Sequence, residues 1–190
     1  MKPLKIAIAG LGTVGAGLVK LLSDNAGPMA ARSGRPIQVV AVSARDRSKD
    51  RGIALAADVA WYEDAAKMAS EADVDVVVEV IGGSDGIAKQ VVEIALERGK
   101  HVVTANKALL AHHGTALART AEAKGLTLGF EAAVAGGIPI IKALKEGLAG
   151  NTLSQVYGIL NGTCNYILTT MRETGRDFAD VLDEAQALGY

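Results

Sequence analysis

The sequence alternates short apolar runs rich in Val, Ile and Ala with longer segments in which apolar residues recur at helical spacing. The short runs predict buried strands, and the longer ones predict amphipathic helices. The expected strands are 4–9, 37–42, 74–81, 101–104 and 126–130, and the expected helices are 13–23, 87–98 and 115–124. Strands that alternate with helices are typical of βαβ units, so we expect an α/β fold with a doubly wound parallel sheet.

Two stretches interrupt this alternation. Residues 27–36 are rich in Gly, Pro, Ser and Arg, and we expect them to form a surface loop. After the second strand we expect a short helical piece and an irregular stretch around Trp61.

The pattern changes after Phe130. A small, Gly-rich stretch is followed by apolar spacing that predicts further elements: a helix at 140–148, a strand at 156–160, and helices at 166–173 and 178–188. We therefore divide the chain into a first domain at 1–135 and the beginning of a second α/β (α+β) domain at 136–190. The second part is small for an independent domain, and we expect it to be truncated.

Composition fits strands covered by helices. Hydrophobic residues make up 49% of the chain but aromatic residues only 4%, so the core must consist of Ala, Val, Ile and Leu. Lys and Arg number 20 against 21 Asp and Glu, which argues against a nucleic-acid partner. The apolar runs are too short to span a membrane, a signal-peptide pattern is missing, and Cys164 is the single cysteine. We expect a cytoplasmic protein with no membrane partner.

A glycine-rich turn joins the first strand to the first helix. Gly10, Gly12 and Gly15 fit the pattern G-x-G-x-x-G in the context that dinucleotide binding requires. Gly10 permits the tight turn, Gly12 lets a pyrophosphate approach the backbone, and Gly15 allows close packing of helix and strand. The N–H groups of Thr13, Val14 and Gly15 would face the anion. A tight turn without a ligand is the alternative, and the context favours a Rossmann domain.

The end of the second strand bears on the choice of cofactor. NAD-specific folds usually place an acidic residue there, which bonds the ribose 2′-hydroxyl. Here the strand tip reads Val-Ser-Ala-Arg, and Arg45 could pair with a 2′-phosphate. The alternative is a solvated basic loop that includes Arg47 and Lys49. The residues favour NADP(H), with NAD(H) as the second choice.

Other segments follow the ends of later strands, where ligands of such sheets bind. Gly82 and Gly83 would let a cofactor lie close to the backbone. Lys107 would enter the cleft and point at a carboxylate or at the cofactor, unless it is an ordinary surface lysine. Backbone carbonyls in 131–139 could bind a cation, although such composition is more common in a hinge.

The chain resembles homoserine dehydrogenase along its whole length. The segments that carry the resemblance are GLGTVG (10–15), VSARD (42–46), EVIGG (79–83), TANK (104–107), EAAVAGGIP (131–139) and NGTCNYIL (161–168). The first of these is generic, whereas the last three together are specific to that family.

The resemblance implies an NAD(P)H-dependent oxidoreductase that interconverts L-aspartate 4-semialdehyde and L-homoserine in threonine, methionine and isoleucine biosynthesis. The implied cofactor contacts are Gly10, Gly12, Thr13, Val14, Gly15, Arg45, Gly82, Lys107 and Gly189. The implied substrate contacts are Lys107, Gly162, Thr163 and Tyr190. A sodium ion would be held by carbonyl oxygens of Glu131, Val134, Gly136 and Ile138. The full-length protein would be a homodimer or homotetramer.

The resemblance places the general acid outside this chain. In the family it is a lysine a short way beyond the Leu-Gly-Tyr at 188–190, so we expect the chain alone to bind cofactor but to turn over homoserine poorly or not at all. A non-catalytic NAD(P)-binding sensor module is the competing interpretation, but a sensor has no need of NGTCNYIL or Tyr190.

Three further side chains could suggest other chemistry. Cys164 lies inside NGTCNYIL, and we interpret it as a small packing residue because no base lies near it in the sequence. His112 and His113 are adjacent, so on a helix they point in different directions. We interpret the pair as part of a solvated helix end and not as metal ligands.

Overall fold

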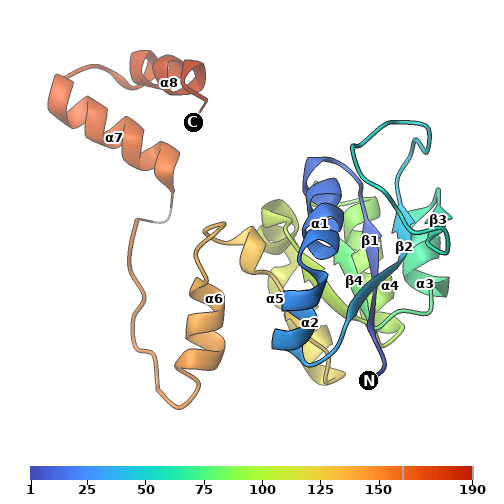
Figure 1. The fold of residues 1–190 in the computed structure, drawn as a ribbon. Helices are drawn as coiled ribbons and strands as arrows, with labels where there is room; N and C mark the ends of the chain where they lie inside the picture. Colours follow the sequence, from blue (N-terminus) through green and yellow to red (C-terminus); the bar gives the residue numbers. More distant parts are fainter. Residues whose placement is uncertain (160, 190) are drawn as a thin grey trace. The chain divides into compact units, whose positions relative to one another are not determined.

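The computed structural model describes residues 1–159 and 161–189. It divides into two compact units, Met1–Gly147 and Leu148–Tyr190 (Figure 1). The first unit contains a six-stranded sheet with helices, and the described part of the second contains two helices. The domain boundary expected between residues 135 and 136 stays a prediction.

All strand pairs in the sheet are parallel, and the strand order is β3-β2-β1-β4-β5-β6. The strands are β1 (Leu4–Ala9), β2 (Ile37–Ser43), β3 (Ala60–Tyr62), β4 (Val76–Glu79), β5 (His101–Thr104) and β6 (Leu128–Gly129). From β1, the strands β2 and β3 follow on one side of the sheet, and β4, β5 and β6 follow on the other. This order is that of the Rossmann fold, and it confirms the expected doubly wound α/β class.

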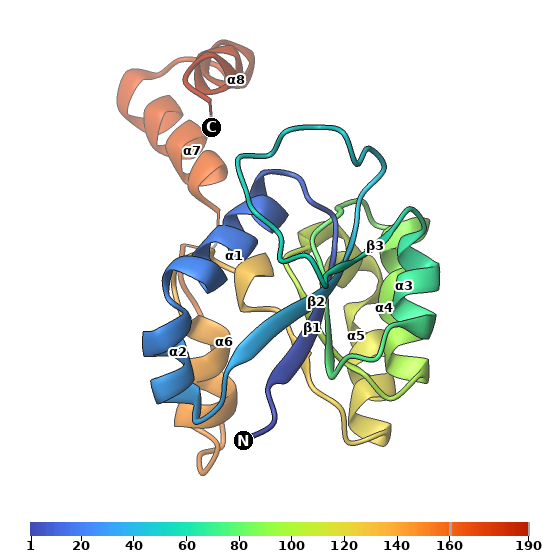
Figure 2. The ribbon, with the colours of Figure 1, turned by 45° about the vertical axis from the view of Figure 1, so that its right-hand side comes forward.

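Helices cover both faces of the sheet (Figure 2). The helices α1 (Thr13–Asp24) and α2 (Ala26–Ser33) lie on one face, and α3 (Ala65–Glu71), α4 (Ile87–Glu97) and α5 (Lys107–Ala123) lie on the other. Successive side chains of a strand point to opposite faces, so β1 contributes to both cores. Ile6 and Ile8 pack in the core under α1, whereas Ala7 and Ala9 pack in the core under the other three helices.

The expected loop at 27–36 is wrong, because α2 occupies most of it. Pro28 lies in the first turn of α2, where a backbone N–H has no partner within the helix and its absence costs nothing. Gly34 ends the helix in the left-handed conformation, with a φ of 75°. Trp61, expected in an irregular stretch, lies in the short edge strand β3.

Other element boundaries also differ from those expected. The strands expected at 74–81 and 126–130 are shortened to β4 and β6. The helix expected from Thr115 begins already at Lys107, because the Asn106 side chain caps it: Oδ1 accepts a hydrogen bond from Leu109 N at 3.0 Å.

Beyond β6 the chain forms a 3₁₀ turn at Glu131–Ala133, and α6 (Ile140–Lys142) continues as a π-helical turn at Ala143–Gly147. In the second unit, α7 (Gly162–Thr174) and α8 (Phe178–Ala187) pack through Ile167, Val181 and Ala185. The strand expected at 156–160 is absent over 156–159, and its last residue lies outside the described residues.

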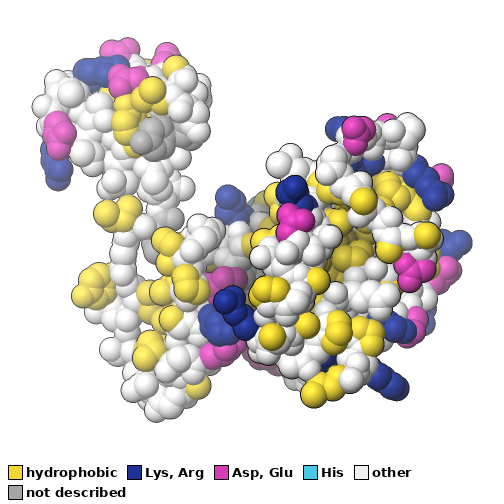
Figure 3. All heavy atoms as spheres, viewed as in Figure 1, with side chains coloured by type: hydrophobic (Ala, Val, Ile, Leu, Met, Phe, Trp, Pro, Cys, Tyr) yellow, Lys and Arg dark blue, Asp and Glu magenta, His cyan; other side chains and the backbone are white. Residues whose placement is uncertain are grey.

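Charged side chains of both signs are interspersed on the face of the first unit seen in Figure 3. Within the described part of the chain, none of the helices combines the length and the apolar character needed to cross a bilayer.

Candidate functional site

The strand register brings the predicted cofactor segments to one edge of the sheet. Ser43, Ala9, Glu79 and Thr104 are paired in a row across β2, β1, β4 and β5, and each is the last residue of its strand. The segments that follow this row are 44–46, 10–15, 80–83 and 105–107. The carboxyl edge of the sheet is where ligands of this fold class bind.

The three glycines of the turn have different surroundings. Gly10 has a φ of 102°, and a Cβ there would lie 2.8 Å from the Val80 carbonyl oxygen. A Cβ on Gly15 would lie 1.9 Å from the Gly10 carbonyl oxygen. At Gly12, by contrast, φ is −74° and a Cβ would meet nothing within 4 Å. The fold therefore requires glycine at Gly10 and Gly15, whereas the open space over Gly12 is what a bound pyrophosphate needs.

Helix α1 presents unbonded N–H groups to this space. Its N-cap is Gly12, which offers no side-chain cap, and its first turn contains no acidic residue. The first backbone bond of the helix runs from Ala16 N to Gly12 O at 2.9 Å, so the N–H groups of Thr13, Val14 and Gly15 lack partners within the helix. The positive end of the helix dipole is thus left for an anion.

A cavity of about 800 Å³ adjoins the turn. Its walls come from the turn, the end of β2, the start of α3 and the end of β4: Gly10, Leu11, Gly12, Ser43, Ala44, Arg45, Asp46, Lys49, Arg51, Glu63, Asp64, Ala65, Val80, Ile81 and Ile87. The volume lies within the range of ordinary ligand sites. Of the predicted cofactor residues, Gly10, Gly12 and Arg45 line this cavity, whereas Gly82 and Lys107 are not among the described residues that line it.

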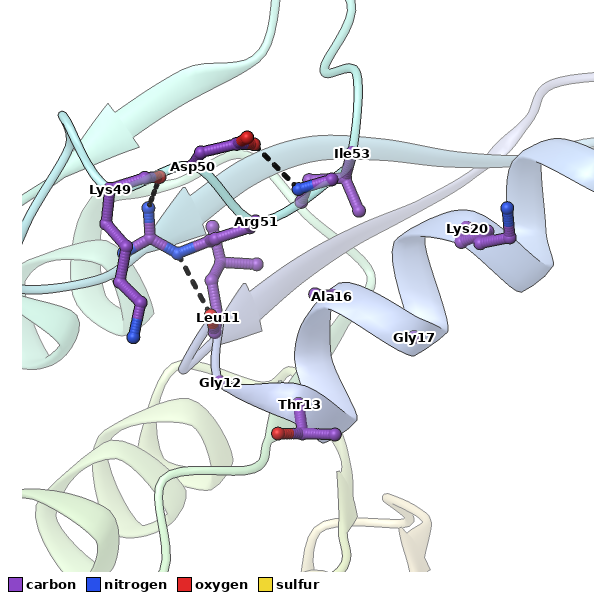
Figure 4. Close-up of a pocket in the computed structure, with 11 residues that line it drawn as sticks. Leu11, Gly12, Thr13, Ala16, Gly17, Lys20, Lys49, Asp50, Arg51 and Ile53 are labelled. Atoms are coloured by element: carbon purple, nitrogen blue, oxygen red, sulfur yellow. Dashed lines mark hydrogen bonds between the residues drawn. The ribbon is translucent and has the colours of Figure 1, made fainter.

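A smaller cavity of about 380 Å³ lies between α1 and the loop at 49–53, and Thr13 lines it (Figure 4). Arg51 lines both cavities, and its role is not evident from the sequence. Its Nε donates a hydrogen bond to Leu11 O at 3.0 Å, and its Nη1 donates one to Lys49 O at 2.8 Å. A third bond runs from Nη2 to Asp46 O at 2.5 Å. The guanidinium thus joins the loop after β2 to the glycine-rich turn at 10–15.

The charged side chains near the tip of β2 differ in whether they contact other groups of the protein. Asp46 Oδ1 accepts hydrogen bonds from Ser48 Oγ at 2.7 Å and Ser48 N at 2.8 Å, and these bonds lower the pKa of Asp46. Arg47 lies over the Trp61 ring, 5.8 Å from its centre. Among the described residues, the side chains of Arg45 and Lys49 have no hydrogen bond or ion pair, although both line the larger cavity. Two cations are thus free to meet an anionic group.

The ends of β4 and β5 are tied together near Lys107, the exposed first residue of α5. Asn106 Nδ2 donates a hydrogen bond to Gly83 O at 2.7 Å. Gly82 and Gly83 have φ values of 90° and 87°, which the glycines adopt without strain. The bond from Asn106 holds the start of α5 against the 82–83 turn.

The expected sodium ligands are spread over the 3₁₀ turn at Glu131–Ala133 and a second turn, which a bond from Ile138 N to Ala135 O closes at 2.9 Å. Ala135 in this turn has a φ of 48°, and the Glu131 carbonyl accepts a hydrogen bond from Val134 N at 3.2 Å. The Glu131 carboxylate caps α6, since it accepts bonds from Ile141 N at 2.9 Å and Lys142 N at 2.8 Å. The expected ion contacts at Glu131, Val134, Gly136 and Ile138 stay a prediction.

In the second unit, the expected substrate residues Gly162 and Thr163 begin α7, which Asn161 caps by accepting a bond from Cys164 N at 2.8 Å. Gly189 follows α8 with a φ of 85°, and Tyr190 lies outside the described residues. Cys164 is exposed, so its interpretation as a packing residue is wrong within this unit.

The interpretation of the histidine pair also needs correction. His112 and His113 lie within α5 and not at its end. His112 is exposed, but His113 Nε2 lies 2.9 Å from Asp85 Oδ1. The contact between His113 and Asp85 links α5 to the loop before α4.

Comparison with known proteins gives the same result for both parts of the chain. Residues 10–131 match the family model described as homoserine dehydrogenase, NAD binding domain, and residues 139–190 match the one described as homoserine dehydrogenase. A homoserine dehydrogenase of Neisseria gonorrhoeae is 52% identical over 190 residues, which are 100% of this chain and 43% of that protein.

Solved structures agree. The crystal structure of a homoserine dehydrogenase from Thiobacillus denitrificans has a TM-score of 0.83 and 47% identity, and the match covers 100% of this chain and 43% of that one. A hyperthermophilic archaeal homoserine dehydrogenase in complex with NADPH has a TM-score of 0.78 and 25% identity, over 99% of this chain and 62% of that one. The chain thus spans less than half the length of its curated relative from Neisseria gonorrhoeae. On the family models, the identity and the strand order together, the chain belongs to the homoserine dehydrogenase family.

Proposed function

We propose that this chain is the cofactor-binding part, and the beginning of the substrate-binding part, of an NAD(P)H-dependent homoserine dehydrogenase. The observation that carries the proposal is the open space over Gly12 beside the unbonded N–H groups of α1. The reaction is the interconversion of L-homoserine and L-aspartate 4-semialdehyde, which belongs to threonine, methionine and isoleucine biosynthesis. The nicotinamide cofactor, when bound, donates or accepts the hydride.

NADP(H) is the preferred cofactor in this proposal, and NAD(H) is the alternative. The pyrophosphate lies over Gly12, and the 2′-phosphate lies between Arg45 and Lys49, whose side chains have no hydrogen bond or ion pair among the described residues. Asp46, which follows Arg45 in the chain, accepts hydrogen bonds from Ser48 within its own turn. The NADPH complex of the archaeal relative supports a phosphorylated cofactor.

On the substrate side, Lys107, Gly162, Thr163 and Tyr190 contact homoserine, and Lys107, Gly82 and Gly189 also contact the cofactor. The general acid is a lysine beyond residue 190, so turnover requires segments that follow this chain. Carbonyl oxygens of Glu131, Val134, Gly136 and Ile138 hold a sodium ion. The complete protein is a cytoplasmic homodimer or homotetramer.

Titration of NADPH and NADH against the wild type and Arg45→Ala tests the cofactor preference. A charge-assisted contact to the 2′-phosphate contributes about 1.5–3 kcal/mol, so the variant should bind NADPH roughly 10- to 150-fold more weakly and NADH unchanged. Arg35→Ala is a matched control, because Arg35 is exposed and precedes β2 at the amino edge of the sheet. Equal losses for the two cofactors in Arg45→Ala would remove the 2′-phosphate from this position.

Steady-state assays with homoserine and NADP test the activity. The complete protein should turn over, and residues 1–190 alone should bind NADPH with a kcat at least about 100-fold lower, because a missing general acid typically costs that much. Comparable kcat values would place the proton donor within this chain. Cofactor binding without turnover by the complete protein would favour the sensor module instead.

A further inference from the structure

Glu79 is a fully buried carboxylate at the end of β4. Its Oε1 accepts hydrogen bonds from Ile81 N at 2.7 Å and from Gly82 N at 3.1 Å. Its Oε2 accepts one from Thr104 Oγ1 at 2.6 Å. Burial of an unpaired carboxylate would be very unfavourable, and these three donors offset the loss of water.

The hydrogen bonds continue to the start of α5. Thr104 Oγ1 accepts a bond from Asn106 N at 3.0 Å, so the single Thr104 hydroxyl proton is free to be donated to Glu79. Asn106 then returns to the loop after β4 through its bond to Gly83 O. Thr104 is completely buried and Asn106 is 5% exposed, so the two bonds of the Thr104 hydroxyl are shielded from water. The result is a closed network that joins the end of β4, the end of β5 and the first turn of α5.

The network also directs backbone carbonyl groups. In a trans peptide the C=O points opposite to the N–H of the same unit. Because the N–H groups of Ile81 and Gly82 turn inward to Glu79, the carbonyls of Val80 and Ile81 turn away from it. The Val80 oxygen accordingly lies against Gly10 in the phosphate-binding turn. Both Val80 and Ile81 line the larger cavity, so the bonds to Glu79 hold backbone that forms part of its wall.

Stability alone does not explain a charge at this position. A buried charge that is replaced by apolar side chains of similar volume often leaves stability unchanged or higher. The residues beside Glu79 in the register are Ala9 and Thr104, and only the latter bonds it. What the carboxylate adds is a defined backbone at 80–83 and a defined start of α5, the two segments that flank Lys107 in the proposed site.

We infer that Glu79 is a positioning residue of the dehydrogenase: it orients the backbone at 80–82 toward the cofactor and, through Thr104 and Asn106, fixes the end of α5 that carries Lys107. This role rests on the proposed function. Glu79 itself touches neither substrate nor cofactor.

The test uses Glu79→Gln, Thr104→Val and Thr104→Ser in the complete protein. The glutamine is isosteric but turns one acceptor into a donor, so it cannot accept all three bonds. The valine removes the hydroxyl from the network, and the serine retains it. The matched control is Lys100→Met: Lys100 is also buried, and its Nζ donates to Ala69 O at 2.6 Å and Ala72 O at 2.7 Å, but it precedes β5 at the amino edge.

Glu79→Gln and Thr104→Val should each lower kcat with homoserine roughly 10- to 100-fold, the loss expected when reacting groups are displaced by about 1 Å. NADPH affinity, which depends mainly on the phosphates, should change less than about threefold. Thr104→Ser should retain most of the wild-type kcat. Lys100→Met should lower the melting temperature and leave kcat unchanged when it is measured on folded protein.

The inference is overturned if Glu79→Gln folds and retains wild-type kcat, if Lys100→Met loses as much kcat as Glu79→Gln, or if Thr104→Ser is as impaired as Thr104→Val. Where Glu79→Gln does not fold, the Thr104→Val and Thr104→Ser pair decides. A wild type that binds no nicotinamide cofactor and does not oxidise homoserine would instead refute the proposed function, and the inference with it.

Discussion

Gly12 and Gly15 lie in the same turn, but a side chain would meet very different surroundings at the two positions. For Gly12→Val we expect a folded protein that has lost its cofactor. The backbone at Gly12, with φ −74° and ψ −163°, is extended and does not require glycine, and a Cβ would meet nothing within 4 Å. The free energy of unfolding should therefore fall by less than about 1 kcal/mol, the ordinary difference between glycine and an apolar residue at an N-cap.

Cofactor binding should respond much more strongly. The valine would fill the space through which a pyrophosphate reaches the N–H groups of α1. Each charge-assisted bond is worth about 1.5–3 kcal/mol, so losing two of them should weaken NADPH binding roughly 10²- to 10⁴-fold. The assay is a fluorescence titration with NADPH, run beside a thermal melt of the same sample.

Gly15→Ala is the companion variant. Its Cβ would lie 1.9 Å from the Gly10 carbonyl oxygen, whereas Cβ atoms in real proteins essentially never come within 3.0 Å of another heavy atom. Helix α1 must shift to relieve this overlap, and overpacking of this kind costs about 1–3 kcal/mol or more. Unchanged NADPH affinity in folded Gly12→Val would show that the turn is only structural. An unchanged melting temperature in Gly15→Ala would refute the packing argument.

The remaining predictions concern three charged side chains. Arg51→Lys retains the charge but loses the forked geometry of the guanidinium, so the free energy of unfolding should fall by about 1–3 kcal/mol. Because Arg51 lies over the ring of Trp61, the single tryptophan, the fluorescence should change as well. Identical spectra and melting curves would contradict the role of Arg51. Lys100→Met should lower the unfolding free energy by about 1–3 kcal/mol, measured by urea denaturation, because the carbonyls at the end of α3 lose a buried donor; an unchanged midpoint would refute it. The hydrogen bonds from Tyr166 and Arg176 lower the pKa of Glu184 below its ordinary value of 4.5. The ionised carboxylate should therefore stabilise the α7–α8 pair fully above pH 4.5, and this stabilisation should be lost as the pH falls through the lower pKa of the folded state. Glu184→Gln should remove that part of the pH dependence of the melting temperature, and parallel pH profiles would exclude the effect.

The sequence predicts well the parts of this fold whose determinants are local. The turn at 10–15 and the helix that follows depend on glycine spacing and on apolar periodicity, both of which lie within a few residues. Pro28 misled the prediction of α2, because proline breaks a helix interior but fits a first turn, and only the helix start distinguishes the two. The strand expected at 156–160 needs a neighbouring strand, and across 156–159 none pairs with it in the described second unit.

The parts of the site that the sequence does not predict depend on backbone partners far along the chain. Arg51 donates a hydrogen bond to the backbone carbonyl of Leu11, and every residue has such a carbonyl. The spacing of residue types in the sequence therefore does not predict this bond. Glu79 appears in the sequence only as a charge that interrupts an apolar strand. The available signal is that Glu79 and Thr104 each end a strand, and two polar residues at the ends of neighbouring parallel strands become neighbours in space.

The contacts of Arg51 have a consequence for how quickly a cofactor can be captured. Ordering a flexible residue costs about 1–2 kcal/mol of conformational entropy, and a loop that became ordered only on binding would weaken affinity accordingly. Because Arg51 bonds Leu11, Asp46 and Lys49 within the protein itself, the loop after β2 is ordered before any ligand arrives. Association then requires little rearrangement, so its rate should be governed by diffusion and by the charges of Arg45 and Lys49. The on-rate for a phosphorylated dinucleotide should therefore fall with rising salt, while the off-rate changes little.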